Sequence, residues 1–144
     1  MFTSALLCLA TTVYFEARNQ DLQGQLAVAQ VVLERVYDAR FPDTVCEVVT
    51  AGGETLHRCA FSFYCDGLSD TPTDERAFLV AKWVASGAMG GFLSDVTGYA
   101  THYHAYYVRP DWALSMRPTA VIGDHLFYRE GTGAEDHGPW DTWK

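Results

Sequence analysis

One acidic residue near the start of the chain has the setting of a catalytic acid. Five apolar residues recur at helical spacing and mark one face of a predicted helix: Leu6, Leu9, Ala10, Val13 and Ala17. Glu16 falls about 20° from Leu9 around that helix, at the edge of the apolar face. Burial there raises the pKa of a carboxyl group, so that it stays protonated near neutral pH and can act as a general acid. The alternative is a Glu16 that reaches water or pairs with Arg18.

Cleavage of a glycosidic bond commonly uses a second carboxylate as base or nucleophile beside the acid. Four acidic residues are candidates for that part: Asp21, Glu34, Asp66 and Asp95. Asp66 is the most suggestive, because it follows an aromatic loop. The spacing selects none of them over the others.

Three histidines raise the alternative of a zinc hydrolase. His102 and His104 are two residues apart on a predicted strand and therefore share a face, and His125 lies on a nearby strand. The other interpretation is that these imidazoles form hydrogen bonds in a polar groove. Since no acidic residue lies at ligand spacing, we expect no metal and no other cofactor. A serine or cysteine nucleophile is weakly supported, because Ser62 has no Gly-x-Ser-x-Gly setting.

Two long helices are predicted first, and they must position Glu16. The apolar segment from residue 2 to 13 leads into Glu16, and residues 19–24 are a polar turn. Residues 26–37 are apolar around most of a helical circumference, which is typical of a central buried helix. Gln30 in this helix either forms hydrogen bonds in the core or points into a cleft.

Two further helices follow, each with a capping signal. Asp43 is a plausible N-cap for a short helix through Val49. Thr71 can cap a longer helix, with Pro72 at its first position and glycines at its end. From residue 98 the apolar period changes to two, which predicts strands.

The predicted strands are residues 100–107, 120–122 and 125–128, and Gly123-Asp124 is a hairpin signal between the last two. Helices followed by a small antiparallel sheet are the α+β pattern. The length suits a single domain over residues 1–130, and residues 131–144 are predicted to be a loosely held tail.

The composition excludes several classes of function. The chain has 144 residues and a formal net charge of -8, which argues against nucleic acid as a partner. The N-terminal apolar run is too short to span a bilayer and has no preceding basic residue, so we interpret it as the first helix of the fold. Cys8 is expected to be a buried thiol, whereas Cys46, Cys59 and Cys65 could include a disulfide.

Several blocks, taken in order, resemble the SleB-type cell-wall hydrolases, a family that includes spore-cortex-lytic enzymes and many bacteriophage endolysins. Residues 14–18 read YFEAR and residues 24–29 read GQLAVA, as at the opening of that family. The later blocks are FPDTVCEVV at 41–49, CAFSFYCDG at 59–67, ATHY at 100–103 and IGDHLFYR at 122–129. The resemblance covers nearly the whole chain, and the ordered set of blocks is highly specific.

The resemblance implies a lysozyme-like α+β fold, with a helical body and a small antiparallel sheet, that cleaves the MurNAc-GlcNAc strand of peptidoglycan. It implies that Glu16 is the catalytic acid/base. The family commonly performs lytic transglycosylation, in which the sugar's own 6-hydroxyl attacks and leaves a 1,6-anhydro end. An intramolecular nucleophile would explain why no second carboxylate stands out. The candidate substrate contacts are Gln30, Phe61, Ser62, Asp66, Thr101, His102, Tyr103 and His125.

The sequence departs from the family pattern at several positions. Asn19-Gln20 replaces a Gly-Glu pair, Glu34 replaces an Asn, and Ala60 replaces a Gln. Three alternatives stay open: a hydrolytic muramidase with Asp66 as second carboxylate, a zinc amidase, and a non-catalytic glycan-binding module. We expect a monomer that acts on the bacterial cell wall without inserting in a membrane. A bare catalytic domain fits a phage endolysin released by a holin, or a virion-borne lysin.

Overall fold

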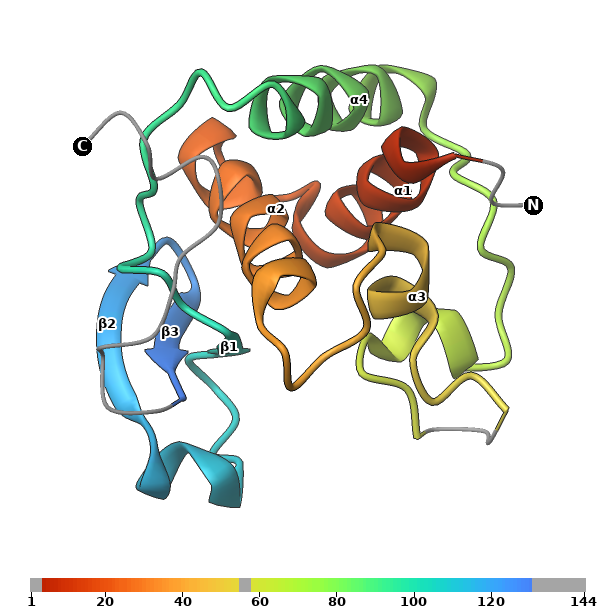
Figure 1. Ribbon diagram of the computed structural model, residues 1–144. Coiled ribbons are helices and arrows are strands. Elements are labelled where there is room, and N and C mark those ends of the chain that lie inside the picture. The colour runs from red at the N-terminus through yellow and green to blue at the C-terminus, as the bar shows by residue number, and fades with distance from the viewer. Residues whose placement is uncertain (1–3, 55–57, 131–144) are drawn as a thin grey trace.

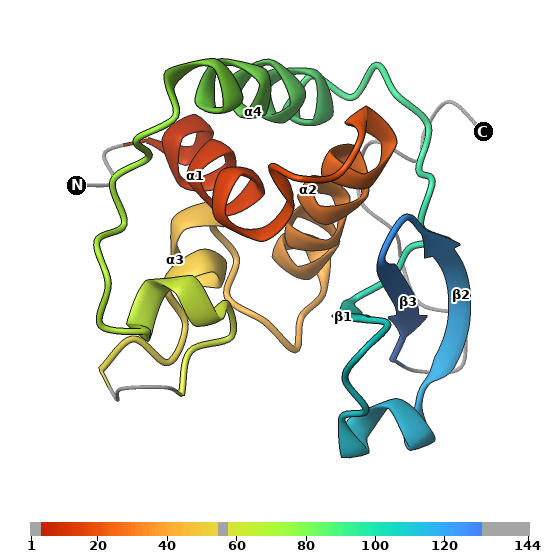
Figure 2. The ribbon, with the colours of Figure 1, turned by 180° about the vertical axis from the view of Figure 1, so that it is seen from behind.

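The computed structural model describes residues 4–54 and 58–130, which form a helical body with a small sheet beside it (Figure 1). The elements in chain order are α1 (Ala5–Ala17), α2 (Leu22–Tyr37), α3 (Val45–Thr50), η1 (Ser62–Cys65), α4 (Glu75–Met89), β1 (His102–Ala105), η2 (Asp111–Ser115), β2 (Arg117–Ile122) and β3 (His125–Arg129). In both views α2 lies between the sheet and helices α1 and α3, and α4 lies across α1 and α2 (Figures 1 and 2). The predicted α+β order is confirmed.

Helix α1 is buried along most of its length because α2, α3 and α4 all pack against it. Ser4 begins the helix by accepting a hydrogen bond from the backbone N–H of Leu7. The helix ends at Ala17, one residue beyond Glu16. Its position therefore places the Glu16 side chain where the helical body meets the sheet.

Helix α2 is longer than the sequence indicates. It begins at Leu22 rather than at residue 26, because the Asp21 carboxylate caps it by accepting from the N–H of Gly24. Its two sides face two apolar clusters: Val32 packs in the cluster shared with α1, and Val31 packs in the cluster shared with the sheet. This double burial explains why the helix is apolar around its circumference.

The predicted caps of the next two helices are wrong by one and three residues. Thr44, not Asp43, caps α3 by accepting from Glu47 N–H. Asp74, not Thr71, caps α4 by accepting from Ala77 N–H. The backbone N–H groups of residues 73 and 74 donate to the hydroxyl of Tyr14 instead, at 3.2 and 3.0 Å. The Tyr14 hydroxyl therefore takes the two N–H groups that a Thr71 cap would have bound.

Cys8 is not a free thiol, contrary to expectation. It forms a disulfide with Cys46, which joins α1 to α3 across 38 residues of sequence. Cys59 and Cys65 form the second disulfide and close the short loop that contains η1. Every cysteine of the chain is therefore paired.

The three strands form an antiparallel sheet in the order β1-β3-β2. β1 is shorter than predicted and covers residues 102–105 only. The hairpin between β2 and β3 turns at residues 123–124, as the sequence indicates. Gly123 has φ +56°, a left-handed conformation that suits glycine. The short helix η2, between β1 and β2, was not predicted.

Two polar side chains of α2 join this helix to the sheet side of the molecule. Gln30 is buried; its amide donates to the carbonyl of Ser94 and accepts from the N–H of Val96. Its role is therefore in the core, and the prediction that it points into a cleft is not supported. Glu34 forms a buried ion pair with Arg129 of β3 at 3.3 Å, and burial raises the pKa of Glu34 to about 7.

The tail expected at residues 131–144 lies outside the described residues, so the division into a domain and a tail stays a prediction. Among the helices that the structure describes, none combines the length and the apolar character needed to cross a bilayer.

Candidate active site

A polar cleft of about 340 Å³ lies where the end of α1 faces the sheet. Its lining comes from α1 and the turn after it, from the end of β1, and from the β2–β3 hairpin. The lining residues are Phe15, Glu16, Arg18, Asn19, Gln20, Ala105, Tyr107, Asp124 and His125. The cleft therefore gathers the predicted acid with residues more than 80 positions away in the sequence.

Glu16 is half-buried in this cleft, and its Oε1 accepts a hydrogen bond from the hydroxyl of Tyr103. Burial raises the pKa of Glu16, while the Tyr103 hydrogen bond and the positive charge of Arg35 lower it. Burial is the largest of these effects. The site thus favours a protonated carboxyl and still offers partners to the carboxylate, which is what an acid that later acts as a base needs.

Tyr103 reaches Glu16 because β1 alternates its side chains between the two faces of the sheet. The register pairs Tyr103 with Phe127 and Ala105 with His125, so these four residues face α1 and α2. Burial and the neighbouring Glu16 raise the pKa of Tyr103 well above its ordinary value. Its hydroxyl therefore remains a donor throughout the neutral range.

Arg35 is a buried cation behind the site, and the sequence analysis did not identify it. Its Nε donates to the carbonyl of Thr101 at 2.7 Å, and its guanidinium lies over the rings of Phe41 and Phe61, 4.9 and 5.3 Å from their centroids. The hydrogen bond joins α2 to Thr101, two residues before Tyr103. A charged residue inside an apolar helix was the signal that could have found it.

Gln20 and Asp124 hold the helical body and the hairpin together at the cleft. The Gln20 amide donates to the Asp124 carboxylate at 3.0 Å and accepts from the Asp124 backbone N–H at 3.1 Å. A glutamate at position 20 could accept but not donate, so an amide suits this contact better than the family's carboxylate. In the sequence Asp124 looks like a turn residue, and no local pattern indicates that it lines the same cleft as Glu16.

His125 is the clearest candidate substrate contact among the predicted residues. It is 8% exposed and lines the cleft, and its ring contacts Tyr103 edge-to-face at 5.1 Å. Burial lowers the pKa of His125, so the imidazole is neutral near pH 7. Among the described residues its Nδ1 has no hydrogen-bond partner.

Thr101 and His102 do not line the cleft. Thr101 is fully buried, and its hydroxyl accepts from the N–H of Glu130. His102 lies on the opposite face of the sheet from Tyr103, beside the ring of Trp112. Burial and the nearby Arg35 lower the pKa of His102 to about 4.

The register also separates the three histidines of the zinc alternative. His104 lies on the outer face with His102, and its ring nitrogens lie 2.8 Å from the Ala105 carbonyl and from the Tyr128 hydroxyl. His125 lies on the inner face. Within residues 4–54 and 58–130, no three histidine, cysteine or acidic side chains come together as a metal site.

The predicted aromatic loop lies beside α1 rather than in the cleft. Phe63 stacks on Phe15, the residue before Glu16, with centroids 5.0 Å apart, while Phe61 is buried against Arg35. Ser62 is exposed, and Asp66 is half-buried and accepts from the Leu68 N–H. Neither Ser62 nor Asp66 lines the cleft that contains Glu16.

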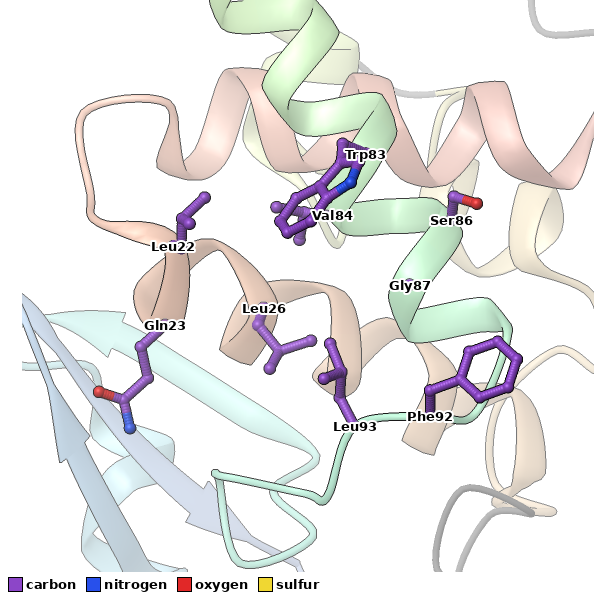
Figure 3. Close-up of a pocket in the computed structure, with 9 residues that line it drawn as sticks. All are labelled: Leu22, Gln23, Leu26, Trp83, Val84, Ser86, Gly87, Phe92 and Leu93. Carbon is purple, nitrogen blue, oxygen red and sulfur yellow. The ribbon is translucent and has the colours of Figure 1, made fainter.

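A second large hollow, between α2 and α4, is apolar and has a different character (Figure 3). Its walls include the exposed rings of Trp83 and Phe92 and the side chains of Leu22 and Leu93. No titratable side chain lines it, so it offers no group for acid-base chemistry. The polar cleft at Glu16 is therefore the candidate active site.

Comparisons with known proteins agree with the resemblance seen in the sequence. The family described as Cell Wall Hydrolase matches residues 19–128. A spore cortex-lytic enzyme of Bacillus cereus is 37% identical over 125 residues, which are 83% of this chain and 42% of that protein. The corresponding enzyme of Halalkalibacterium halodurans is 34% identical over 124 residues, 83% of this chain and 33% of that protein. The chain thus spans less than half the length of these curated relatives.

Solved structures show the same fold. The catalytic domain of the germination-specific lytic transglycosylase SleB from Bacillus anthracis has a TM-score of 0.71 at 30% identity, over 90% of this chain and 97% of that one. The catalytic domain of the Bacillus cereus SleB protein has a TM-score of 0.69 at 32% identity, over 87% and 89%. The chain belongs to the cell wall hydrolase family, with the fold of the SleB catalytic domain.

Proposed function

We propose that this protein cleaves the glycan strands of peptidoglycan as a lytic transglycosylase, with Glu16 as its single acid and base. The observation that carries the proposal is the half-buried Glu16 carboxyl in a polar cleft, hydrogen-bonded to Tyr103. The similarity to a structure described as a germination-specific lytic transglycosylase supports the same reaction. The family match begins at residue 19, so the assignment of Glu16 rests on its geometry and on the YFEAR motif.

The proposed reaction uses Glu16 twice. Its protonated carboxyl donates a proton to the glycosidic oxygen, and the bond between that oxygen and C1 of the muramic sugar breaks. The 6-hydroxyl of the same sugar then attacks C1, and the Glu16 carboxylate accepts its proton. One C–O bond breaks and another forms, no water is consumed, and Glu16 ends protonated as it began. Between the two steps Tyr103 and Arg35 stabilise the carboxylate.

Other residues of the cleft are proposed to bind the sugars. The imidazole of His125 lines the cleft, and the ring of Tyr107, 74% exposed, offers a flat apolar surface to a sugar face. Arg18 lines the cleft with its guanidinium over the ring of Tyr14, 4.7 Å from the centroid. The substrate contacts predicted at Phe61, Ser62, Asp66, Thr101 and His102 are replaced in this proposal by residues that line the cleft.

Hydrolysis is the second candidate function, and one observation favours Asp124 over Asp66 as its second carboxylate. Asp124 places a carboxylate in the same cleft as Glu16, whereas Asp66 does not. A water molecule activated by Asp124 would give a hydrolytic muramidase. The Asp124 carboxylate already accepts a hydrogen bond from the Gln20 amide, so a water molecule would have to share or replace that partner.

The function is tested by Glu16→Gln, which keeps the shape of the side chain and removes its proton chemistry. We expect the variant to fold normally and to lose activity on purified peptidoglycan by about a thousandfold or more. Glu75→Gln, which changes an exposed carboxyl in the first turn of α4, is the matched control and should leave activity unchanged.

The results of this test, and of two measurements on the wild-type protein, distinguish the candidate functions. Substantial lysis by Glu16→Gln at a normal melting temperature would contradict the proposed role of Glu16. Saturable binding of peptidoglycan by the wild-type protein without released product would indicate a glycan-binding module. Activity that disappears after chelation would return attention to a metal-dependent amidase.

We further propose that the protein acts as a monomer at the bacterial cell wall, where its substrate lies. The spore cortex-lytic enzymes among its relatives are consistent with this site of action. Release by a holin and carriage on a virion remain predictions from the sequence.

A further inference from the structure

A third hollow, of about 590 Å³, lies on the outer face of the sheet, beneath η2. The lining residues are His104, Tyr106, Val108, Arg109, Pro110, Asp111, Ala113, Leu114, Pro118, Leu126 and Tyr128. Since His104 and Leu126 pair across β1 and β3 on the face opposite Tyr103, this hollow and the Glu16 cleft lie on the two sides of β1. The proposed reaction does not use it.

The hollow combines an apolar surface with two opposite charges at its edge. Leu114 is 92% exposed, and Pro118 and Leu126 continue the apolar surface. Arg109 and Asp111 are both exposed, and neither has an opposite charge within 4.0 Å among the described residues. A ligand that carries both a carboxylate and an amino group would complement this pair.

Two neighbouring tyrosines lie between the hollow and the active-site cleft. Tyr106 lines the hollow, Tyr107 lines the cleft, and their rings meet edge-to-face with centroids 5.4 Å apart. Among the strands that the structure describes, β1 lies at the edge of the sheet, and none of the others separates the two sites. An extended peptide of five residues spans about 17 Å, which is enough to pass around one strand from the cleft.

We propose that this hollow binds the stem peptide of peptidoglycan while the muramic sugar that carries the peptide occupies the cleft. The inference rests on the proposed function, because it names a further part of the same substrate. Stem peptides carry free carboxylates and, where they are not cross-linked, a free amino group on the diamino acid. Arg109 binds a carboxylate, Asp111 binds the amino group, and the apolar surface packs against the alanine side chains.

The test compares two substrates: glycan strands that carry uncross-linked stem peptides, and the same strands after an amidase has removed the peptides. We expect the wild-type protein to have a higher kcat/KM on the peptide-bearing strands. Arg109→Gln should reduce kcat/KM on these strands by about fivefold and should not change activity on peptide-free strands. Arg76→Gln, an equal charge change on the exposed side of α4, should leave both activities unchanged.

A second variant tests the hollow itself while Arg109 is kept. Ala113→Phe fills the space with a ring, so it should also remove the preference for peptide-bearing strands. The proposal is overturned if the wild-type protein prefers peptide-free strands, or if Arg109→Gln and Ala113→Phe retain the wild-type preference. It is also overturned if they reduce activity on both substrates equally. A wild-type protein that cleaves neither substrate would instead contradict the proposed function.

Discussion

The properties of Glu16 result from opposing effects of its neighbours. Burial raises its pKa and holds the proton that the first step needs, whereas Tyr103 and Arg35 lower the pKa and stabilise the carboxylate that the second step needs. A carboxyl group with only one of these environments would serve only one of the steps. Tyr103 is therefore as much a part of the proposed chemistry as the acid itself.

At this scale we predict that Tyr103→Phe lowers kcat/KM about tenfold, because it removes a hydrogen bond to the charged form of Glu16. It should also shift the pH profile. Without the donor the pKa of Glu16 rises, the acid stays protonated to higher pH, and the alkaline fall in kcat/KM moves to higher pH. Tyr37→Phe removes the same atom from an exposed tyrosine at the end of α2 and is the control. An unchanged profile in Tyr103→Phe would mean that Tyr103 only supports the structure.

The sequence predicted Glu16 from its place on the first helix, and it predicted His125 and Tyr103 from the family blocks. It could not predict which residues share a cleft, because that depends on the register of β1 and β3 and on the packing of α2. Arg35 and Asp124 are residues near the site that the sequence pattern alone does not indicate. One looks like an interruption of an apolar helix and the other like a turn residue until the fold brings them near Glu16.

Among the elements, the β2–β3 hairpin closes one side of the cleft, and Gly123 is the position on which this contact depends. Besides its φ of +56°, a Cβ there would lie 2.3 Å from the Gln20 side-chain oxygen. A larger residue would therefore displace the Gln20 side chain from its contact with Asp124.

We predict that Gly123→Ala lowers the free energy of unfolding by about 1–2 kcal/mol and also lowers activity, because alanine is strained in the left-handed conformation and Gln20 is displaced from Asp124 at the cleft. Gly67→Ala separates the two causes: its φ is +84°, but a Cβ there has no neighbour within 4 Å. The Gly67→Ala variant should therefore lose only the free energy that alanine costs in a left-handed conformation, with no steric contribution. Adding Gln20→Ala to Gly123→Ala should recover part of the lost stability. Urea denaturation of the wild-type protein, the Gly123→Ala, Gly67→Ala and Gln20→Ala variants and the double variant measures these differences, and additive effects of the Gly123 and Gln20 changes would contradict a direct contact.

The order and type of the major elements were predictable because their periods are clear, whereas their ends were not. The start of α4 depends on Tyr14, a residue about 60 positions away whose hydroxyl takes up the N–H groups before the helix. The start of α2 depends on a cap at Asp21 within a segment whose polarity suggested a turn. The Tyr14 contact is long-range and leaves no local pattern, whereas the Asp21 cap is local but lies in a segment that also has the composition of a turn.

On the scale of the whole molecule, two disulfides restrain the helical body, and the cysteine spacing did not reveal their pairing. The Cys8–Cys46 bridge closes the longer loop and joins α1 to α3. Its effect on stability should therefore be the larger of the two, because a longer closed loop restricts the unfolded chain more.

We predict that replacing both Cys8 and Cys46 by alanine lowers the free energy of unfolding by about 2–4 kcal/mol. Replacing Cys59 and Cys65 removes a bridge with a sequence separation of only 6 and should cost less. Equilibrium denaturation of the two double variants beside the wild-type protein checks the order. A greater loss from the shorter loop would contradict the loop-length argument.

On the scale of the whole molecule, the central proposal is that Glu16 cleaves the glycan strand without a water molecule. The most direct measurement is mass spectrometry of the products released from purified peptidoglycan in water enriched in ¹⁸O. The account predicts 1,6-anhydromuramic ends, one water lighter than the hydrolysed product and free of ¹⁸O. Reducing muramic ends that contain ¹⁸O would contradict it and would make Asp124 the candidate base of a hydrolase.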